Sequence, residues 1–355
     1  MKALNRLFAP AGQDLAVDLG TANTVVFRTG EGIVLFEPSV VAIDEASGEV
    51  RAVGEEARRM IGRTPASIRA TRPLRHGVIA DFEVTEEMLR YFIGNTKRGM
   101  LQRPRVALCV PSGVTEVERR AVEEAAMAAG ARRVFLIEEP LAGAIGADLP
   151  VAEPTATMVV DIGGGTSEMA VIALGGMVVA HSLRVGGYEL DEAIVRQLQR
   201  EHTLLVGQEQ AEQVKIAIGS AFAADVDAEA EVAGRDLTSG LLRRVTLSAE
   251  EVERALRRPL AQIIEAVKDT LERTPPELAA DLGSRGIVLF GGGALLRRLD
   301  QLLERETGLA VTVVDSPLLC VARGAGRTLH EVALLEQERP PLHWRKGRRS
   351  IFRGR

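Results

Sequence analysis

Two stretches of this chain share one local pattern, and the distance between them constrains the fold. In LAVDLGTANTVVF (15–27) and in VVDIGGGTSEMAV (159–171), an apolar run ends in an aspartate. One hydrophobic residue, a glycine and small polar residues follow, and a second apolar run begins. The two aspartates, Asp18 and Asp161, lie 143 residues apart, far beyond the roughly 20–50-residue periods of solenoid repeats. The sequence therefore predicts two similar domains within one chain of 355 residues.

The glycines of these stretches have two possible roles. Taken alone, Asp-Gly and Gly-Gly pairs are ordinary hairpin turns. Two such turns facing each other would instead offer phosphate oxygens their backbone N–H groups and four hydroxyls, those of Thr21, Thr24, Thr166 and Ser167. A third glycine element, GIVLFGGGALLRRLD (286–300), leads from an expected strand straight into an expected helix. Such a junction suits the approach of a nucleotide, although by itself it also permits tight packing.

Asp18 and Asp161 extend this hypothesis to a metal ion. In the facing arrangement both carboxylates would point at the same gap, where they would repel a polyphosphate unless a divalent cation lay between them. Mg²⁺ is held in this way, by one or two carboxylates together with phosphates and several waters. We therefore expect Mg²⁺ and a polyphosphate ligand between the two domains.

Water is the expected nucleophile for phosphoryl transfer. The five histidines have no motif-like surroundings, and neither a Ser-His-Asp nor a Cys-His pairing is evident. Phosphoryl transfer then needs a side chain that orients a water molecule in line. LIEEPLAGAIG (136–146) offers Glu138 and Glu139 at an expected strand end, before a helix that begins with proline. The alternative is that both are solvated acids at a helix N-terminus, stabilised by the helix dipole.

Composition narrows the class of protein. The chain is 46% hydrophobic with a mean hydropathy of +0.06, as expected of a soluble globular protein. A net charge of −5 and 3% aromatic residues argue against nucleic-acid binding, because the chain has no overall basic field and little material for base stacking. Cys109 and Cys320 lie in apolar runs without metal-ligand spacing, which predicts reduced core residues of a cytoplasmic protein. No apolar stretch reaches the roughly 18–20 residues that span a bilayer.

Strand-like and helical segments alternate along the chain. The expected strands are 15–19, 24–28, 33–43, 105–110, 133–137, 157–162, 168–173, 176–184, 287–290 and 310–314. The expected helices are about 54–61, 84–98, 115–129, 141–147, 189–202, 208–222, 249–272, 294–306 and 317–334. This mixture predicts an α/β architecture with helices packed against sheets.

A series of motifs extends from about residue 14 to residue 332. Among them are DLGTANT, EPSVVAI, RPLRHGVIADFEVTEEML, VPSGVTEVERRA, VFLIEEPLAGAIGADLPV, MVVDIGGGTSEMAVI and GIVLFGGGALLRRLD. In their order and at their intervals, these motifs closely resemble the MreB family, the bacterial actins that determine rod shape. The DxGxxT pattern alone would indicate only the wider superfamily of actin, Hsp70 and sugar kinases.

The resemblance implies an actin-like fold of two lobes, each with a mixed β-sheet flanked by helices. ATP and Mg²⁺ would lie in the cleft between the lobes. The implied division is lobe I at 14–152 (small subdomain about 41–75), completed by about 318–335, and lobe II at 153–317 (small subdomain about 186–247). An amphipathic segment at 1–13 and a basic, disordered tail at 336–355 would flank the lobes.

The resemblance also assigns roles to individual residues. Glu139 and Thr166 look like the pair that orients the attacking water, and Asp18 and Asp161 like residues that act on magnesium through water. By motif position, the nucleotide contacts are Thr21, Ala22 and Asn23 in a first phosphate loop, Gly163, Gly164, Gly165 and Thr166 in a second, Glu212 and Lys215 at the ribose and adenine, and Gly292, Gly293, Ala294 and Leu295 on the adenosine side. The implied activity is ATP binding with slow hydrolysis coupled to filament turnover.

Members of this family form paired protofilaments with ATP at the inner face of the cell membrane and guide wall synthesis through the elongation machinery. Two segments fit such a peripheral location. Met1, Leu4, Leu7 and Phe8 fall on one helical face, which predicts an amphipathic anchor, the alternative being a frayed terminus. The tail 336–355 carries a cluster of Arg and Lys that fits anionic lipid, with solvated disorder or contact with another protein as the alternatives.

Two other functions stay open at this stage. A plasmid-segregating bacterial actin would bind a DNA-adaptor complex rather than lipid. A metabolic kinase of the same superfamily would need a sugar-binding carboxylate and a closing cleft.

Overall fold

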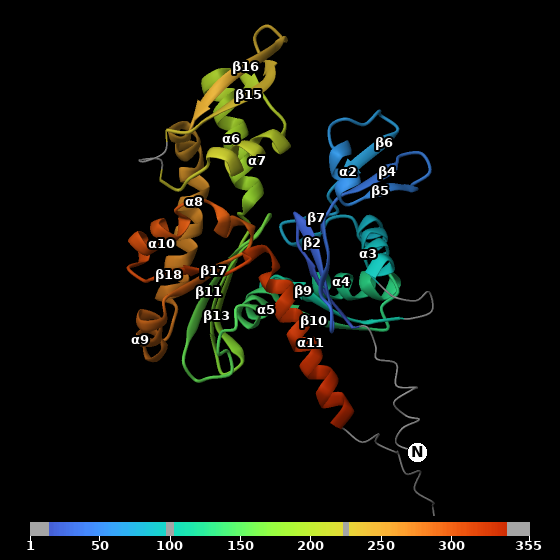
Figure 1. The fold of residues 1–355 in the computed structure, drawn as a ribbon, viewed down its shortest axis with the longest axis vertical. Coiled ribbons are helices and arrows are strands. Elements are labelled where there is room, and N and C mark those ends of the chain that lie inside the picture. The colour runs from blue at the N-terminus through green and yellow to red at the C-terminus, as the bar shows by residue number, and fades with distance from the viewer. Residues whose placement is uncertain (1–13, 97–102, 223–226, 339–355) are drawn as a thin grey trace, which may run out of the picture.

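Two mixed five-stranded sheets form the centres of two lobes (Figure 1). The computed structural model describes residues 14–96, 103–222 and 227–338, with side chains up to Leu329. The first sheet has the order β10-β9-β1-β2-β3, with β1 Leu15–Leu19, β2 Asn23–Arg28, β3 Gly32–Pro38, β9 Arg105–Val110 and β10 Arg133–Glu138. The second has the order β13-β12-β11-β17-β18, with β11 Thr157–Ile162, β12 Ser167–Ala173, β13 Gly176–Leu183, β17 Ile287–Phe290 and β18 Val311–Val313.

The two sheets have the same design. β1 pairs antiparallel with β2 and parallel with β9, and β11 pairs in the same way with β12 and β17. The repeated sequence pattern therefore falls on equivalent hairpins, β1–β2 and β11–β12. The expectation of an α/β fold with two similar lobes is confirmed.

Alternating side chains of each sheet enter two different cores. Leu15, Val17 and Leu19 of β1 face the helices α3 (Phe82–Thr96) and α4 (Glu116–Ala128), whereas Ala16 faces the opposite side. Val159 of β11 shares that opposite core, together with α5 (Glu139–Gly146) and α11 (Cys320–Glu338). These two helices therefore lie between the two sheets, as period-two alternation in fully buried strands allows.

The remaining elements cover the second sheet and extend both lobes. The covering helices are α6 (Gly187–His202), α8 (Ala249–Glu272), α9 (Pro276–Arg285) and α10 (Leu299–Thr307). One small sheet, β5-β4-β6, contains β4 (Val41–Asp44), β5 (Val50–Val53) and β6 (Ile68–Thr71) and packs with α2 (Glu55–Met60). The other, β14-β15-β16, contains β14 (Leu204–Leu205), β15 (Glu229–Asp236) and β16 (Leu242–Ser248) and packs with α7 (Gln208–Ile218). A two-stranded ribbon joins β7 (Leu74–Arg75) and β8 (Val78–Ile79).

Two expected elements were wrong in a way that matters for the cleft. The expected strand 33–43 is two strands, because the chain leaves the first sheet at Ser39, whose hydroxyl donates to Gly20 O at 2.6 Å. The expected helix 294–306 begins only at Leu299, since a 3₁₀ turn, η1 (Gly292–Leu295), comes first. Gly291 at φ +81° and Arg298 at φ +59° make the chain turn twice before that helix. A second 3₁₀ turn, η2 (Pro317–Leu319), precedes α11.

Other expectations have mixed outcomes. Cys109 and Cys320 are free and buried, as expected. No helix of the described ranges has the length and apolarity needed to cross a membrane. The amphipathic segment 1–13 and the end of the basic tail, 339–355, lie outside the described residues. The boundaries between the lobes remain a prediction.

The crossing of α5 and α11 depends on glycines. A Cβ atom on Gly324 would lie 1.7 Å from Ala142 O, and one on Gly146 would lie 1.9 Å from Cys320 O. The two helices therefore touch backbone to backbone, which leaves no room for side chains at the crossing.

We expect Gly324→Ala to destabilise the protein by roughly 1–3 kcal/mol, because the added methyl overlaps a backbone carbonyl that cannot rotate away. Urea unfolding measures the effect. The matched control is Gly94→Ala in α3, where a Cβ would meet nothing within 4 Å. There the better helix propensity of alanine should raise stability by up to about 1 kcal/mol. Equal effects of the two substitutions would contradict the close crossing.

Candidate functional site

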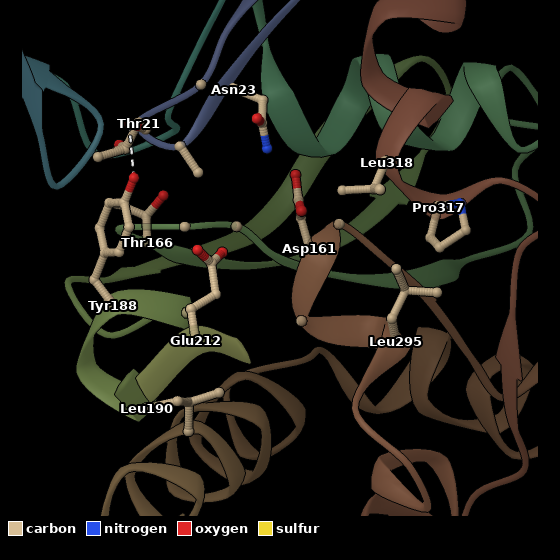
Figure 2. Close-up of a pocket in the computed structure, with 18 of the residues that line it drawn as sticks. Thr21, Asn23, Asp161, Thr166, Tyr188, Leu190, Glu212, Leu295, Pro317 and Leu318 are labelled. Atoms are coloured by element: carbon tan, nitrogen blue, oxygen red, sulfur yellow. Dashed lines mark hydrogen bonds between the residues drawn. The ribbon is translucent and has the colours of Figure 1, made fainter. Parts of the chain in front are cut away.

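The β1–β2 turn presents its backbone to the space between the lobes. Gly20 is needed here, because a Cβ on it would lie 2.6 Å from Asn23 O. Thr21 is held from two sides: its Oγ1 accepts from Gly77 N at 3.0 Å, and its carbonyl accepts from the Tyr188 hydroxyl at 3.3 Å (Figure 2). The second contact joins the first lobe to the start of α6 in the second lobe.

The β11–β12 turn lies against the first one. Gly163 N donates to Thr166 O at 2.8 Å, which closes the turn. A Cβ on Gly164 would lie 2.6 Å from the Ala22 Cβ, so only glycine permits the turns to approach this closely. The structure thus brings together the two Asp-x-Gly hairpins that the sequence places 143 residues apart.

Two of the hydroxyls expected to face phosphate do not do so. Thr24 is fully buried and its Oγ1 lies 2.8 Å from Ser39 Oγ. Ser167 is also fully buried and donates to Val185 O at 2.7 Å. Both are strand residues whose hydroxyls make hydrogen bonds within their own lobe. The expectation that these two hydroxyls face phosphate was therefore wrong. Thr21 and Thr166 line the cavity.

Three acidic side chains converge on one cavity of about 440 Å³ between the lobes. Asp18 ends the apolar run of β1, Asp161 occupies the same position in β11, and Glu139 is the first residue of α5. Burial raises the pKa of Asp18 to about 7. Burial, and then the charge of neighbouring carboxylates, raises the pKa of Glu139 and of Asp161 well above the usual range.

These acids fit a divalent cation. Among the described residues no arginine, lysine or histidine neutralises any of the three, although Asp161 is only 6% exposed and Glu139 only 9%. Buried charges in proteins are normally paired or bound to a metal. Oxygen ligands with room for water and phosphate are the set that Mg²⁺ prefers.

The two adjacent glutamates separate into different roles. Glu139 lines the cavity and is buried, whereas Glu138 is 31% exposed and lies 3.6 Å from Arg119. The interpretation as a solvated acid at a helix N-terminus therefore suits Glu138 and not Glu139. Thr166, 6% exposed, lines the same cavity from the opposite lobe.

The other end of the cavity is apolar. Leu295, Pro317 and Leu318 lie together there, away from Thr21 and Thr166 (Figure 2). Leu295 is 58% exposed, and Leu318 is 37% exposed. Exposed aliphatic side chains at this end of the cavity suit a flat group with apolar faces, such as a nucleobase.

The third glycine element also approaches Asp161. Glycine is required at 291 because a Cβ there would lie 2.2 Å from Asp161 Oδ1.

Helix α7 contributes charged groups to the middle of the cavity. Glu212 points into it (Figure 2). Lys215 Nζ lies 2.7 Å from Asp191 Oδ1 and donates to Gly187 O at 3.0 Å. Burial raises the pKa of Asp191 to about 6, and Lys215 opposes that rise. The lysine thus anchors the start of α6 as well as facing the cavity.

The remaining assigned residues divide into two groups. Ala22, Asn23, Gly163, Gly164, Gly292 and Gly293 line the cavity. Gly165 and Ala294 do not. Gly165 instead packs against Thr21 and His76, and Ala294 is 6% exposed within the core of the second lobe.

Tyr188 and Asp191 line the cavity without having been predicted. Burial raises the pKa of Tyr188 to about 12, and the guanidinium of Arg72 lies 4.8 Å from its ring centre. The Gly-Gly pair at the start of α6 is the sequence feature that could have indicated these two residues. A Cβ on Gly186 would lie 2.8 Å from Gly163 O. That contact brings the start of α6 onto the second glycine turn.

Comparison with known proteins gives concordant results. A sequence model described as MreB/Mbl protein matches residues 12–337. The chain is 54% identical over 325 residues to the cell shape-determining protein MreB of Escherichia coli K12, covering 90% of this chain and 94% of that protein. The structure of MreB5 of Spiroplasma citri bound to ADP is similar with a TM-score of 0.87 at 35% identity, over 92% of this chain and 98% of that one.

Two further structures extend the comparison. MreB5 bound to AMPPNP gives a TM-score of 0.85 at 35% identity, over 91% of this chain and 97% of that one. The MamK double helical filament gives 0.76 at 25% identity, over 92% and 100%. Two equivalent sheets around a shared cavity therefore define an actin-like protein. The chain belongs to the MreB/Mbl family, and the family expected from the motifs is confirmed.

We expect Asp161→Asn to raise the free energy of unfolding of the nucleotide-free protein by about 1–3 kcal/mol. Burial raises the pKa of Asp161 in the folded state, so at neutral pH folding must either bury its charge or bind a proton, and asparagine avoids both costs. Urea unfolding at neutral pH measures the change. The same substitution should abolish any stabilisation by Mg²⁺ and ATP together. Asp227→Asn, at an exposed aspartate, is the control and should change neither quantity. A destabilised Asp161→Asn protein without ligands would contradict the argument.

Proposed function

We propose that this chain is an ATP-dependent filament protein of the cytoskeleton that maintains rod cell shape. The observation that carries the proposal is the meeting of two glycine turns and three unneutralised buried acids in one cavity, in a member of the MreB/Mbl family. The similarity to a cell shape-determining protein over 90% of the chain favours this function over a plasmid-segregating actin or a metabolic kinase.

ATP would bind with its phosphates between the two turns and its base at the apolar end. Free backbone N–H groups of the β1–β2 and β11–β12 turns would donate to the phosphates, with the hydroxyls of Thr21 and Thr166 beside them. Glu212 and Lys215 would contact the ribose and adenine, between the phosphates and Leu295. The similarity to the solved MreB5 structures bound to ADP and to AMPPNP supports the binding of a nucleotide.

Hydrolysis would depend mainly on positioning. Mg²⁺, held by Asp18 and Asp161 through its waters, would neutralise the charge that develops on the phosphate oxygens. Glu139 would accept a hydrogen bond from the attacking water, and Thr166 would hold the same water from the other lobe. Because these two side chains belong to opposite lobes, the rate would depend on how the lobes are set relative to each other.

Assembly would place the protein at the inner face of the cell membrane. Paired protofilaments are the expected assembly, and the MamK double helical filament supports self-association in this fold. The face formed by Met1, Leu4, Leu7 and Phe8 would insert into lipid, and the basic tail would add electrostatic attraction. The partner of this filament would be the cell-wall elongation machinery. The filament would lie in the cytoplasm, attached peripherally to the inner face of the cell membrane.

Glu139→Ala should slow phosphate release by roughly 10²-fold, since the attacking water loses its acceptor, while ATP affinity changes little. A phosphate-release assay and titration with a fluorescent ATP analogue give the two quantities. Sedimentation should show filaments that form with ATP and persist longer than those of the unsubstituted protein. The adjacent control, Glu138→Ala, removes an acid that faces Arg119 and should leave hydrolysis unchanged. Equal losses in both variants would contradict the assignment.

Sedimentation with anionic liposomes tests the membrane part of the proposal. The protein with ATP and Mg²⁺ should pellet with the liposomes, and Leu7→Glu should reduce that fraction by roughly tenfold, because a filament multiplies a weak anchor. Asn5→Glu introduces the same charge off the apolar face and should reduce it far less. Truncation after residue 338 measures how much the basic tail contributes to the fraction of protein that pellets with the liposomes. A protein that stays monomeric and unbound with every nucleotide would overturn the proposed function.

A further inference from the structure

Glu168 is a buried acid for which the proposed chemistry has no use. It lies on β12, is 1% exposed, and is not among the residues that line the cavity. In the β11–β12 ladder its direct partner is Asp161. An ionised side chain that is buried this completely requires strong partners to remain stable.

Its partners belong to both lobes. Oε2 accepts from Ser112 N at 3.0 Å and also from the Ser112 hydroxyl. Oε1 accepts from the hydroxyl of Ser182, which lies on β13 in the same sheet as Glu168. Ser112 follows β9 in the sheet of the other lobe. The carboxyl group thus joins the lobes through hydrogen bonds that use both of its oxygens.

The equivalence of the two sheets shows that the shared fold does not demand this acid. Val25 pairs with Asp18 in β1–β2 as Glu168 pairs with Asp161 in β11–β12. The loops after the parallel strands correspond as well: Ser112 follows β9 by two residues, and Gly292 follows β17 by two. In the second lobe that loop lines the cavity, whereas in the first lobe it receives a carboxylate from across the cleft.

The contact connects segments of chain that lie close to the proposed water-orienting pair. β9 lies beside β10, where Val110 pairs with Glu138, and Glu139 follows immediately. On the other lobe Thr166 precedes Glu168 by two residues. A change in the contact between Ser112 and Glu168 therefore alters the separation of Glu139 and Thr166 through only a few backbone bonds on each side.

We propose that Glu168 is a positioning residue that clasps Ser112 and so fixes the angle between the lobes at which Glu139 and Thr166 hold one water. This inference rests on the proposed function for its effect on hydrolysis, but the clasp itself is a contact between two side chains that can be measured apart from hydrolysis. Glu168 does not line the cavity, and acts through Glu139 and Thr166, which do.

Two serine substitutions test whether the contact between the lobes matters, or only the number of hydrogen bonds that Glu168 accepts. Ser112→Ala removes a donor from the opposite lobe, and Ser182→Ala removes a donor to the same carboxylate from its own lobe. Ser112→Ala should lower kcat for ATP hydrolysis about tenfold with ATP affinity within about twofold, since misplacement affects the reacting geometry rather than binding. Ser182→Ala should leave kcat within about twofold. Equal losses of kcat would overturn the proposal.

Substitutions of Glu168 itself supply a rescue test. Glu168→Ala removes every acceptor and should lower kcat further than Ser112→Ala. Glu168→Gln keeps the shape and one acceptor oxygen, which can face the Ser112 N–H while its amide donates to the Ser182 hydroxyl. It should therefore retain most of the activity. A Gln variant as inactive as the Ala variant would contradict the clasp.

A measurement without nucleotide keeps this inference separate from the proposed function. Spin labels at Ala46→Cys and Leu241→Cys, two exposed positions on different lobes, report the distance between the lobes by double electron–electron resonance. Cys109 and Cys320, each 3% exposed, should not react with the label. Ser112→Ala and Glu168→Ala should broaden the distance distribution, and Ser182→Ala should not. Unchanged distributions in all three would overturn the clasp, whereas a wild type that does not hydrolyse ATP would overturn the function alone.

Discussion

Desolvation of three carboxyl groups around one cavity is the constraint on which the rest of the structure depends. Asp18 comes from one sheet, Asp161 from the other, and Glu139 from the helix between them. Burial raises the pKa of each, and no described cation lies beside them. Ligand binding to such a cavity stabilises the arrangement of the lobes, because the ligand supplies the missing charge to the folded state only. Occupancy of the cavity and arrangement of the lobes are therefore linked.

The lobes are joined behind the cavity by a rigid contact. α5 and α11 lie between the sheets and touch backbone to backbone at Gly146 and Gly324. Close-packed contacts of this kind have few alternative arrangements, so this crossing restricts how the two sheets can be placed relative to each other. The clasp between Glu168 and Ser112 supplies a second, polar connection close to Glu139 and Thr166. A close-packed crossing and a hydrogen-bonded clasp together define how the two turns face each other.

The equivalence of the lobes explains what each contributes. The β1–β2 and β11–β12 hairpins keep the same aspartate and the same glycine-rich turn, and both face one cavity. Their surroundings differ: Glu168 stands where the first lobe has Val25, and glycines stand after β17 where the first lobe has Pro111 and Ser112. The equivalent features form the end of the cavity that we propose for the phosphates, and the differences create its apolar end and the clasp.

The sequence determined the local features of this protein. The period-two strands, both Asp-x-Gly turns and the position of Glu139 at a helix start could be predicted, because they depend on backbone sterics within a few residues. The motifs identified the family, and the resemblance to it indicated Glu212 and Lys215, which line the cavity. The break before α10 was missed, since Arg298 adopts a left-handed conformation that its residue type does not favour.

Only the tertiary structure decided which distant groups meet. Tyr188 bonds to Thr21, Lys215 pairs with Asp191, and Glu168 reaches Ser112 across the cleft. In the same packing, Thr24 and Ser167 are fully buried, and Gly165 and Ala294 do not line the cavity. No local pattern carries these contacts, because they depend on how two sheets pack against one helix pair. The sequence thus specified the two turns, and packing specified what they face.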